Sequence, residues 1–546
     1  MPALPIPVRQ FMRACRLRKN ELKFADSTGM SLTGGRALLT ALVFRRVLYR
    51  LLGKNEKNVG VLMPISVYGV LANLGLALNR RTSVNLNYTF SSGTINDCIK
   101  RAEVRHVITS RKVLDRFPNL KLDAGLIVME DIAKQVTFPD KLTAFIDAYI
   151  TPIPCLEWAF GLNNVPPDDL ITIIFTSGST GAPKGAMITQ GNIAANVEAF
   201  SRHIEFTGED RLLGTLPLFH AYGYATAFWL PATSGIAGIY HFNPLEAKKV
   251  AETARKFGCS VFPTTPTFLR NYLRRSQKED YETLRLIICG AEKLPADLTD
   301  AWEAKFGVRP GEGYGVTELS PVVATNVPKG RRKDYKDYLR DGTVGRPLFN
   351  VKARIVQPET GECLPDDTPG MLEISGPSVM KGYYNDPEKT KEVLKDGWYT
   401  TGDIAAIDKD GFIKIVGRQS RISKIGGEMV PHILLEDEIC KVLAGVHSNT
   451  DKNTDDTAVT GDEVKIAVAA VPDDRKGERL IVLHTQLTQT PEEVCKALHA
   501  AGLPNLWIPS PNDFHQIEAI PLLGTGKLDL RAVRETAERL GTPSSP

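Results

Sequence analysis

Strand patterns and helix patterns alternate along the chain from Ala37 to about residue 340. Short β-branched runs at Asn58–Pro64, His106–Ser110 and Leu126–Glu130 are separated by segments with apolar residues at helical spacing. Parallel strands need a crossover connection that is usually a helix, so this alternation predicts an α/β fold with mostly parallel sheets. Ligands of such folds bind where strands end, so the polar residues after each strand are the first candidates for a site.

The pattern changes near residue 340. Short strands and turns follow, and the last of them form a hairpin that turns at Asp410–Gly411. We predict a large N-terminal domain over residues 1–418 that includes a β-rich subdomain at about 340–418. A hinge at 419–421 and a small mobile α+β domain at 422–546 complete the prediction, with strands at 464–471 and 479–484 and a helix at Pro491–Ala501.

Charge and cysteine content exclude several classes of protein. The chain has 67 Lys and Arg against 63 Asp and Glu, a net charge of +4, which is too even for nucleic-acid binding. Its eight cysteines form no CxxC pair, and there is no signal peptide or run of 18 apolar residues. We therefore expect a cytoplasmic protein. Its basic N-terminus, which includes Arg9, Arg13, Arg16 and Arg18, is the segment that would contact the inner face of a membrane.

A loop of small and hydroxyl residues, Thr176–Gly185, follows a buried strand and has the sequence TSGSTGAPKG. Small residues let backbone N–H groups approach phosphate oxygens, hydroxyls add donors, and Lys184 adds a positive charge. The loop lacks the GxxxxGK[ST] pattern of P-loop nucleotide hydrolases. It predicts a phosphate site that includes Thr176, Ser177, Gly178, Ser179, Thr180, Gly181 and Lys184.

This loop resembles the phosphate loop of adenylate-forming enzymes, the superfamily of acyl-CoA synthetases, peptide-synthetase adenylation domains and luciferases. Seven further segments resemble motifs of that superfamily and occur in the expected order, across a resemblance that spans about residues 30–535. These segments are Pro217–Tyr224, Cys289–Leu294, Gly313–Glu318, Gly397–Asp403, Gly417–Arg418, Lys424–Val430 and Pro521–Lys527.

The residue types in these segments suit binding of ATP and Mg²⁺. The Tyr314 ring could stack on adenine, Thr317 offers a hydroxyl to a phosphate, and Glu318 is a hard oxygen ligand. Asp403 is suited to accept hydrogen bonds from two ribose hydroxyls, and Arg418 to reach ribose or phosphate. The resemblance implies that Thr176 and Glu318 hold Mg²⁺. It also implies that the nucleotide lies along Gly290, Ala291, Glu292, Gly313 and Gly315.

The resemblance also assigns roles to four other residues. Lys527 would span the substrate carboxylate and the α-phosphate during adenylation, and His220, placed at the end of an apolar strand, would lie beside that carboxylate. Gly426 and Gly427 would lie against the pantetheine arm of the acceptor. The sequence departs from the family at Ser420, where Asp or Lys is usual in the hinge.

Three segments resemble acyl-acyl-carrier-protein synthetases, including the ligase half of an enzyme that reacylates 2-acyl-glycerophosphoethanolamine. They are Asn79–Ser91, Ala102–Arg111 and Lys424–Val430. The resemblance implies a stand-alone ligase that joins a fatty acid to acyl carrier protein. An acidic carrier protein needs a basic docking surface. Two clusters are candidates, one at Arg331, Arg332, Lys333, Lys336 and Arg340 and the other at Arg475, Lys476 and Arg479.

Four alternatives remain open at this point. They are an acyl-CoA synthetase, a fatty acyl-AMP ligase, a non-catalytic acyl- or nucleotide-binding protein, and a phosphate-releasing NTPase. The presence of Lys527, Glu318, Asp403 and Arg418 argues against the non-catalytic protein. Candidate residues of an acyl pocket are Phe228, Trp229, Phe262, Phe268 and Leu269, although aromatic runs after strands more often belong to the core.

Overall fold

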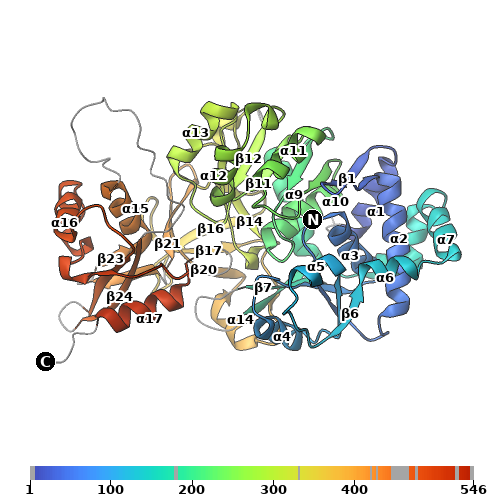
Figure 1. Cartoon of the computed structure of the whole chain (residues 1–546), viewed down its shortest axis with the longest axis horizontal. Helices are drawn as coiled ribbons and strands as arrows, with labels where there is room; N and C mark the ends of the chain where they lie inside the picture. The colour runs from blue at the N-terminus through green and yellow to red at the C-terminus, as the bar shows by residue number, and fades with distance from the viewer. Residues whose placement is uncertain are drawn as a thin grey trace.

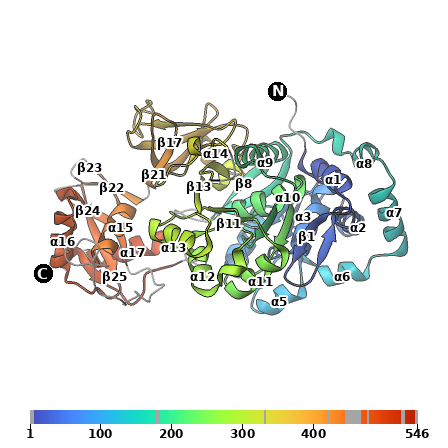
Figure 2. The same ribbon diagram turned by 90° about the horizontal axis from the view of Figure 1, so that it is seen from above.

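The computed structural model describes residues 6–176, 183–329, 333–418, 421–425, 428–443, 466–473, 477–522 and 528–541. Figures 1 and 2 show the chain as an elongated molecule, with the C-terminal elements at one end and helix α7 at the other. Most of the length between them is an α/β body, which confirms the predicted fold class.

Two large sheets form this body. The first has seven strands in the order β18 (Gly382–Tyr383), β8 (Lys184–Thr189), β7 (Leu170–Thr176), β4 (Thr82–Asn85), β3 (Asn58–Val61), β5 (His106–Thr109) and β6 (Gly125–Val128). Strands β7, β4, β3, β5 and β6 are parallel, while β8 runs antiparallel to β7. Their carboxyl ends therefore meet at one edge, as the alternating pattern predicts.

The second sheet has nine strands. Their order is β15 (Arg346–Pro347), β14 (Val322–Thr325), β13 (Gly311–Gly315), β12 (Leu286–Cys289), β11 (Val261–Thr264), β9 (Arg211–Gly214), β10 (Ala237–Tyr240), β1 (Leu22–Asp26) and β2 (Ser31–Thr33). The run from β13 to β1 is parallel, and antiparallel strands close both sides of the sheet.

The helices of the body pack around these sheets. Helix α3 (Val67–Leu78) is apolar on every side, and all of its residues except Tyr68 are buried, as expected for a helix inside a core. Helix α2 (Gly34–Leu51) packs beside α3. The other helices are α1 (Pro7–Leu17), α4 (Ser92–Arg101), α5 (Arg111–Arg116), α6 (Met129–Lys134), α7 (Phe138–Tyr149), α8 (Ile153–Ala159), α9 (Gln190–Ile204), α10 (Leu230–Thr233), α11 (Ala247–Phe257), α12 (Pro266–Arg275) and α13 (Ala296–Phe306).

A five-stranded sheet follows the body, in the region where the sequence predicts a β-rich subdomain. Its strands are β16 (Lys352–Val356), β17 (Gly370–Ser375), β19 (Leu394–Lys395), β20 (Trp398–Ile407) and β21 (Ile413–Arg418), with α14 (Pro387–Val393) between β18 and β19. Strands β20 and β21 form the predicted hairpin, whose turn contains Asp408 as an acceptor for the N–H groups of Asp410 and Gly411. The hairpin holds Asp403 opposite Arg418.

The C-terminal unit is a separate small α+β layer, seen at the left of Figures 1 and 2. Its strands are β22 (Ile422–Ile425), β23 (Glu428–Pro431), β24 (Ile466–Asp473), β25 (Gly477–His484) and β26 (Phe514–Gln516), and its helices are α15 (His432–Leu443), α16 (Pro491–Ala500) and α17 (Leu530–Gly541). Lys293 of the body forms an ion pair of 2.5 Å with Asp437 of α15. Among the described helices, none is long and apolar enough to cross a bilayer.

Candidate active site

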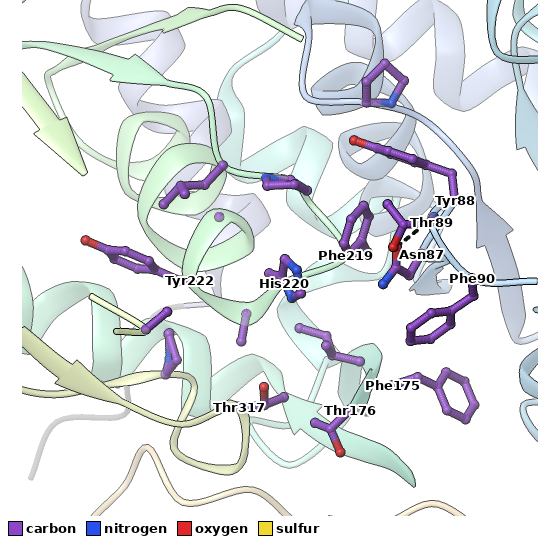
Figure 3. Close-up of a pocket in the computed structure, with 18 of the residues that line it drawn as sticks. Asn87, Tyr88, Thr89, Phe90, Phe175, Thr176, Phe219, His220, Tyr222 and Thr317 are labelled. Atoms are coloured by element: carbon purple, nitrogen blue, oxygen red, sulfur yellow. Dashed lines mark hydrogen bonds between the residues drawn. The ribbon is translucent and has the colours of Figure 1, made fainter. Parts of the chain in front are cut away.

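A cavity of about 1630 Å³ lies where the carboxyl ends of both large sheets face each other. The first sheet contributes the segments that follow β3, β4, β5, β6 and β7, and the second contributes those that follow β9, β10, β11, β12 and β13. Figure 3 shows Asn87–Phe90 and Phe175–Thr176 on one side, with His220, Tyr222 and Thr317 on the other. The site therefore occupies the place that parallel α/β topology favours for ligands.

The candidate phosphate loop begins at this cavity. Thr176 ends β7 and lies opposite Lys184, the first residue of the antiparallel β8, and both line the cavity. The Lys184 ammonium lies 5.7 Å from the ring centre of Tyr383, and burial lowers the pKa of Lys184 from its usual value. Ser177, Gly178, Ser179, Thr180 and Gly181 lie outside the described residues.

Glu318 provides a buried carboxylate in the cavity wall. It follows β13 in a short 3₁₀ turn, is 9% exposed, and lies next to Thr317, which also lines the cavity. The Tyr383 hydroxyl donates a hydrogen bond of 2.8 Å to Glu318 Oε1. Burial raises the pKa of Tyr383, which keeps this hydroxyl protonated as a donor. The bond orients the carboxylate and leaves it further lone pairs for another ligand.

Asp403 lies at the centre of a small charged network. Its carboxylate is 2% exposed and accepts a hydrogen bond of 2.8 Å from Arg418 Nε and another from the Tyr314 hydroxyl. Proximity to Asp403 raises the pKa of Arg418, and burial raises that of Tyr314 well above its usual value. Arg418 lines the cavity, as do Thr401 and Gly402, which directly precede Asp403 in β20. The predicted site residues Asp403, Arg418 and Tyr314 are thus brought together.

The two segments predicted to follow the nucleotide also meet here. Ala291 and Glu292 after β12, and Gly315 at the end of β13, line the cavity. Gly290 and Gly313 are adjacent to these segments, since a Cβ on Gly290 would lie 3.2 Å from the ring of Tyr222, which lines the cavity, and 3.6 Å from the carbonyl oxygen of Gly313. Glu292 accepts hydrogen bonds of 3.1 and 2.7 Å from the backbone N–H and the hydroxyl of Thr267.

His220 is an exposed residue of the cavity wall, and Figure 3 shows it in the middle of the site. The prediction that His220 ends a strand is wrong, because β9 ends at Gly214 and a turn closed by Pro217 follows. The turn leads into a π-helix at Gly223–Trp229. A Cβ on Gly223 would lie 2.2 Å from the Pro217 carbonyl oxygen, so the turn requires glycine there.

The part of the cavity beside α5 and α6 has aromatic walls. The ring of Tyr88 packs edge-on against Phe219, with ring centres 4.9 Å apart, and at a tilt against Phe117, with ring centres 5.8 Å apart. Tyr88 follows a strand of the first sheet and Phe219 a strand of the second, so this contact connects the two sheets. Phe90 completes this wall in Figure 3. At the exposed rim α5 presents Lys112 and Arg116, and α6 presents Glu130. We call this region the α5 arm.

The α5 arm was missed by the sequence analysis. The sequence did contain a signal for it, because Asn85–Phe90 and Thr109–Lys112 lie at the ends of strands of a parallel sheet, and those ends must converge.

The five acyl-pocket candidates differ in whether they line the cavity. Phe268 lines the cavity, whereas the other four are fully buried in the core, as the alternative interpretation expected: Phe228, Trp229, Phe262 and Leu269.

Three sets of predicted residues lie wholly or partly outside the description. Lys527, Gly426, Gly427 and Ser420 are not described, so their placement stays a prediction. Arg421 of the predicted hinge is 4% exposed and forms an ion pair with Glu436 of α15, which attaches it to the C-terminal unit. The hinge at 419–421 stays a prediction, because residues 419 and 420 lie outside the described residues.

Two arginines of the candidate docking clusters form ion pairs within the chain. Arg340 forms ion pairs with Asp408 and Asp410, and Arg479 forms one with Asp513. Both guanidinium groups are therefore engaged within the chain. Lys333 and Lys336 are exposed, whereas the remaining members lie outside the described residues: Arg331, Arg332, Arg475 and Lys476.

Within the described ranges, no group of three or more His, Cys, Asp or Glu residues is arranged to hold a metal ion. Mg²⁺ commonly uses one or two carboxylates together with phosphate oxygens of a substrate and water. Glu318 and the hydroxyls of Thr176 and Thr317 are hard oxygen donors, and all three residues line the cavity. This donor set fits Mg²⁺ that arrives with a nucleotide.

Known proteins with similar sequences are acid–thiol ligases by name. The chain is 30% identical over 380 residues to a long-chain-fatty-acid–CoA ligase of Bacillus subtilis, which covers 68% of this chain and 62% of that protein. It is 30% identical over 413 residues to a 4-coumarate–CoA ligase of Vanilla planifolia, which covers 72% of each chain.

Solved structures extend the similarity over nearly the whole chain. ATP-bound MatB from Rhodopseudomonas palustris has a TM-score of 0.79 at 25% identity and covers 98% of this chain and 100% of its own. O-succinylbenzoate CoA synthetase from Bacillus subtilis, solved with ATP and magnesium, shares the fold with a TM-score of 0.76 at 19% identity, covering 96% and 98%. The family profile described as AMP-binding enzyme matches residues 11–384. The chain therefore belongs to the AMP-binding enzyme family.

Proposed function

We propose that this enzyme uses ATP and Mg²⁺ to join a fatty acid to the phosphopantetheine thiol of acyl carrier protein. In the first step a fatty-acid carboxylate oxygen bonds to the α-phosphorus of ATP and diphosphate leaves. In the second step the thiol sulfur bonds to the acyl carbon and AMP leaves. The observation that carries the proposal is one cavity bordered by Glu318 and Arg418, apolar walls and the cationic rim of the α5 arm.

The adenine is assigned to the side of the cavity formed by the second sheet, and the phosphates to the ends of β7 and β8 that border the cavity. Ala291, Glu292 and Gly315 would follow the adenine, and Arg418 with the Asp403 carboxylate would bind the ribose. Thr176, Thr317 and Lys184 would contact the phosphates. Mg²⁺ held by Glu318 and Thr176 would supply positive charge to the phosphate oxygens when bound. Lys527 is assigned to the developing charge between the two substrates by the sequence resemblance.

The fatty-acid chain is assigned to the apolar wall near His220. Leu216, Phe219, Phe268 and Val316 line the cavity there, and an aliphatic chain gains about 0.8 kcal/mol for each CH₂ that is buried. His220 would contact the carboxylate.

The acceptor is assigned to the α5 arm. Its aromatic wall suits the uncharged part of a pantetheine, and Lys112 with Arg116 suits the phosphate at its outer end. Acyl carrier protein is favoured by the resemblance of Asn79–Ser91 and Ala102–Arg111 to acyl-carrier-protein synthetases. Coenzyme A is the second candidate, because the similar proteins named above are CoA ligases. Both acceptors carry the same pantetheine phosphate.

A panel of fatty acids assayed with holo-acyl carrier protein and with coenzyme A at equal concentration tests the proposal. We expect AMP and diphosphate with both the acid and the acceptor present, and a higher kcat/KM for the carrier protein. A higher value for coenzyme A would select the second candidate. Release of ADP and phosphate, or of AMP without any thioester, would refute the ligase function itself.

Reversing the charge of the rim should affect the acceptor step alone. We expect the Lys112→Glu/Arg116→Glu variant to raise the Michaelis constant of the acceptor by roughly tenfold, since a phosphate would lose two charged partners. Diphosphate exchange with fatty acid and ATP should keep its wild-type rate. Lys100→Glu provides a control, because Lys100 of α4 is exposed and is not among the residues that line the cavity. An unchanged acceptor constant would remove the α5 arm from the acceptor path.

A further inference from the structure

Helix α7 is oriented opposite to the usual amphipathic arrangement. Its inward face carries the small or charged residues Asp140, Ala144 and Ala148, which are buried against the body. Large apolar side chains project outward from α7, from the residue after it and from α8. These are Phe138 (75% exposed), Leu142 (48%), Phe145 (49%), Ile146 (41%), Ile150 (66%) and Trp158 (75%). We call this surface the α7–α8 face.

The exposed apolar residues of the α7–α8 face are concentrated in one short stretch of the chain. Thirteen large apolar side chains are exposed among the described residues, and six of them lie in the 21 residues from Phe138 to Trp158. Contiguous exposed apolar patches mark contact sites for proteins or membranes, whereas single exposed apolar residues need no explanation.

Buried carboxylates fix the face to the body. Asp140 of α7 accepts hydrogen bonds from Arg46 and Arg50 of α2, at 3.1 and 2.7 Å. Glu157 of α8 pairs in the same way with Arg9 and Arg13 of α1, both at 2.8 Å. The hydrogen bond from Arg50 holds the pKa of Asp140 well below its usual range. The outward direction of the apolar side chains is thus a built feature of the body.

The arginines of the basic N-terminus are engaged with other parts of the protein. Arg9 and Arg13 bind Glu157, Arg16 donates to the carbonyl oxygens of Asp147 and Thr151, and Arg18 pairs with Glu21. The segment predicted to contact a membrane by its charge therefore supports the α7–α8 face from behind.

The surroundings of the face are strongly positive. Helices α1, α2, α7 and α8 contain eight Lys or Arg and three Asp or Glu, a net charge of +5, whereas the whole chain carries +4. Two of the three acidic residues, Asp140 and Glu157, are buried. Lys141, which precedes Leu142 in α7, is exposed, and so is Arg36 of α2. Apolar side chains flanked by cations are typical of surfaces that rest on anionic lipid.

The position of the face suits a flat surface as the binding partner. Figures 1 and 2 both show α7 at the extreme end of the molecule, opposite the C-terminal unit. Helix α6, which lines the cavity through Met129, Glu130 and Ala133, ends at Lys134, and α7 begins at Phe138. A lipid surface at the face would therefore lie close to the cavity.

We propose that the α7–α8 face docks this enzyme on the surface of an anionic lipid bilayer. The biological purpose rests on the proposed function, because long-chain fatty acids partition into membranes and docking would bring the cavity near them. The binding itself is independent of ligase chemistry and can be measured without ATP or fatty acid.

Co-sedimentation with vesicles of equal parts phosphatidylcholine and phosphatidylglycerol tests the proposal on the full chain. We expect wild-type protein to bind these vesicles and to bind pure phosphatidylcholine less, with weaker binding as salt rises toward about 1 M. The variant Phe138→Ser/Phe145→Ser/Trp158→Ser should bind roughly tenfold or more weakly. Phe349→Ser, which removes an aromatic ring of 50% exposure outside these helices, should bind like wild type.

Tryptophan fluorescence gives a second readout that does not depend on a triple substitution. Trp158 is exposed, while Trp229, Trp302, Trp398 and Trp507 are buried or half-buried. Vesicles should shift the emission to shorter wavelength, and brominated lipid should quench it. The conservative variant Trp158→Phe should lose this response but keep binding.

Three outcomes would overturn the proposal. One is wild-type protein that ignores anionic vesicles. Another is equal binding by wild type and the triple serine variant. The third is wild-type protein that forms a dimer in light scattering, does not bind vesicles, and becomes a monomer in the triple variant; the face would then join two copies of the chain. Wild-type protein that forms the thioester but does not bind vesicles would reject docking alone. Wild-type protein that binds vesicles but forms no thioester would reject the ligase function alone.

Discussion

Replacing Lys527 with alanine should lower the rate of acyl-adenylate formation by about 10²–10³ and leave thioester formation from supplied acyl-adenylate nearly unchanged. The residue lies in Gly524-Thr-Gly-Lys527, which resembles the loop that brings a cation to the adenylation site. Removing a charge aimed at the developing charge of a transition state costs about 2.7–4 kcal/mol. The second step does not form that charge, so it should not depend on Lys527.

Single-turnover assays of each half-reaction check this expectation. Lys496→Ala, an exposed lysine on α16 of the same unit, is the matched control and should retain both rates. Equal loss of both half-reactions in Lys527→Ala would contradict the assigned role and indicate disruption of the C-terminal unit.

Replacing Asp403 with asparagine should raise the Michaelis constant of ATP by about 10- to 150-fold, because a charge-assisted hydrogen bond is worth about 1.5–3 kcal/mol. Asp403 is 2% exposed and accepts bonds from Arg418 and Tyr314, yet a carboxylate has about four lone-pair sites and can still accept ribose hydroxyls. The Michaelis constant of the fatty acid should change little.

Tyr314→Phe separates direct binding from positioning. It removes the hydroxyl that donates to Asp403 and leaves the carboxylate in place. We expect a much smaller change in the ATP constant for Tyr314→Phe than for Asp403→Asn. A thermal unfolding curve for each variant reports any loss of the buried network. Equal effects of the two substitutions would mean that Asp403 acts by holding Tyr314, and an unchanged ATP constant would remove Asp403 from the site.

The sequence predicted which segments form the site better than it predicted which residues of each segment line the cavity. Thr176, Lys184, Glu318 and Arg418 line one cavity, as the motifs indicated. Motif order says nothing about which member of a segment faces inward. Gly315 lines the cavity, whereas Gly290, Gly313 and Tyr314 do not, and this difference depends on how β12 and β13 pack.

The α5 arm shows why a cavity is harder to predict than a motif. Tyr88 and Phe219 are 131 positions apart in the sequence, and they meet because they follow strands of different sheets that face each other. Periodicity reports the neighbours along one strand or helix, whereas contact between two sheets depends on the packing of every helix between them.

The sequence by itself determined the α/β class, the β20–β21 hairpin and the family, because these depend on local periodicity, turn residues and motifs in order. Tertiary structure alone decided which site residues line the cavity, the α5 arm and the direction of α7. Helix α7 illustrates the physical reason. Its apolar residues would ordinarily predict a buried face, but Asp140 binds Arg46 and Arg50 across a long gap in sequence, and that buried ion pair directs the aromatic side chains outward.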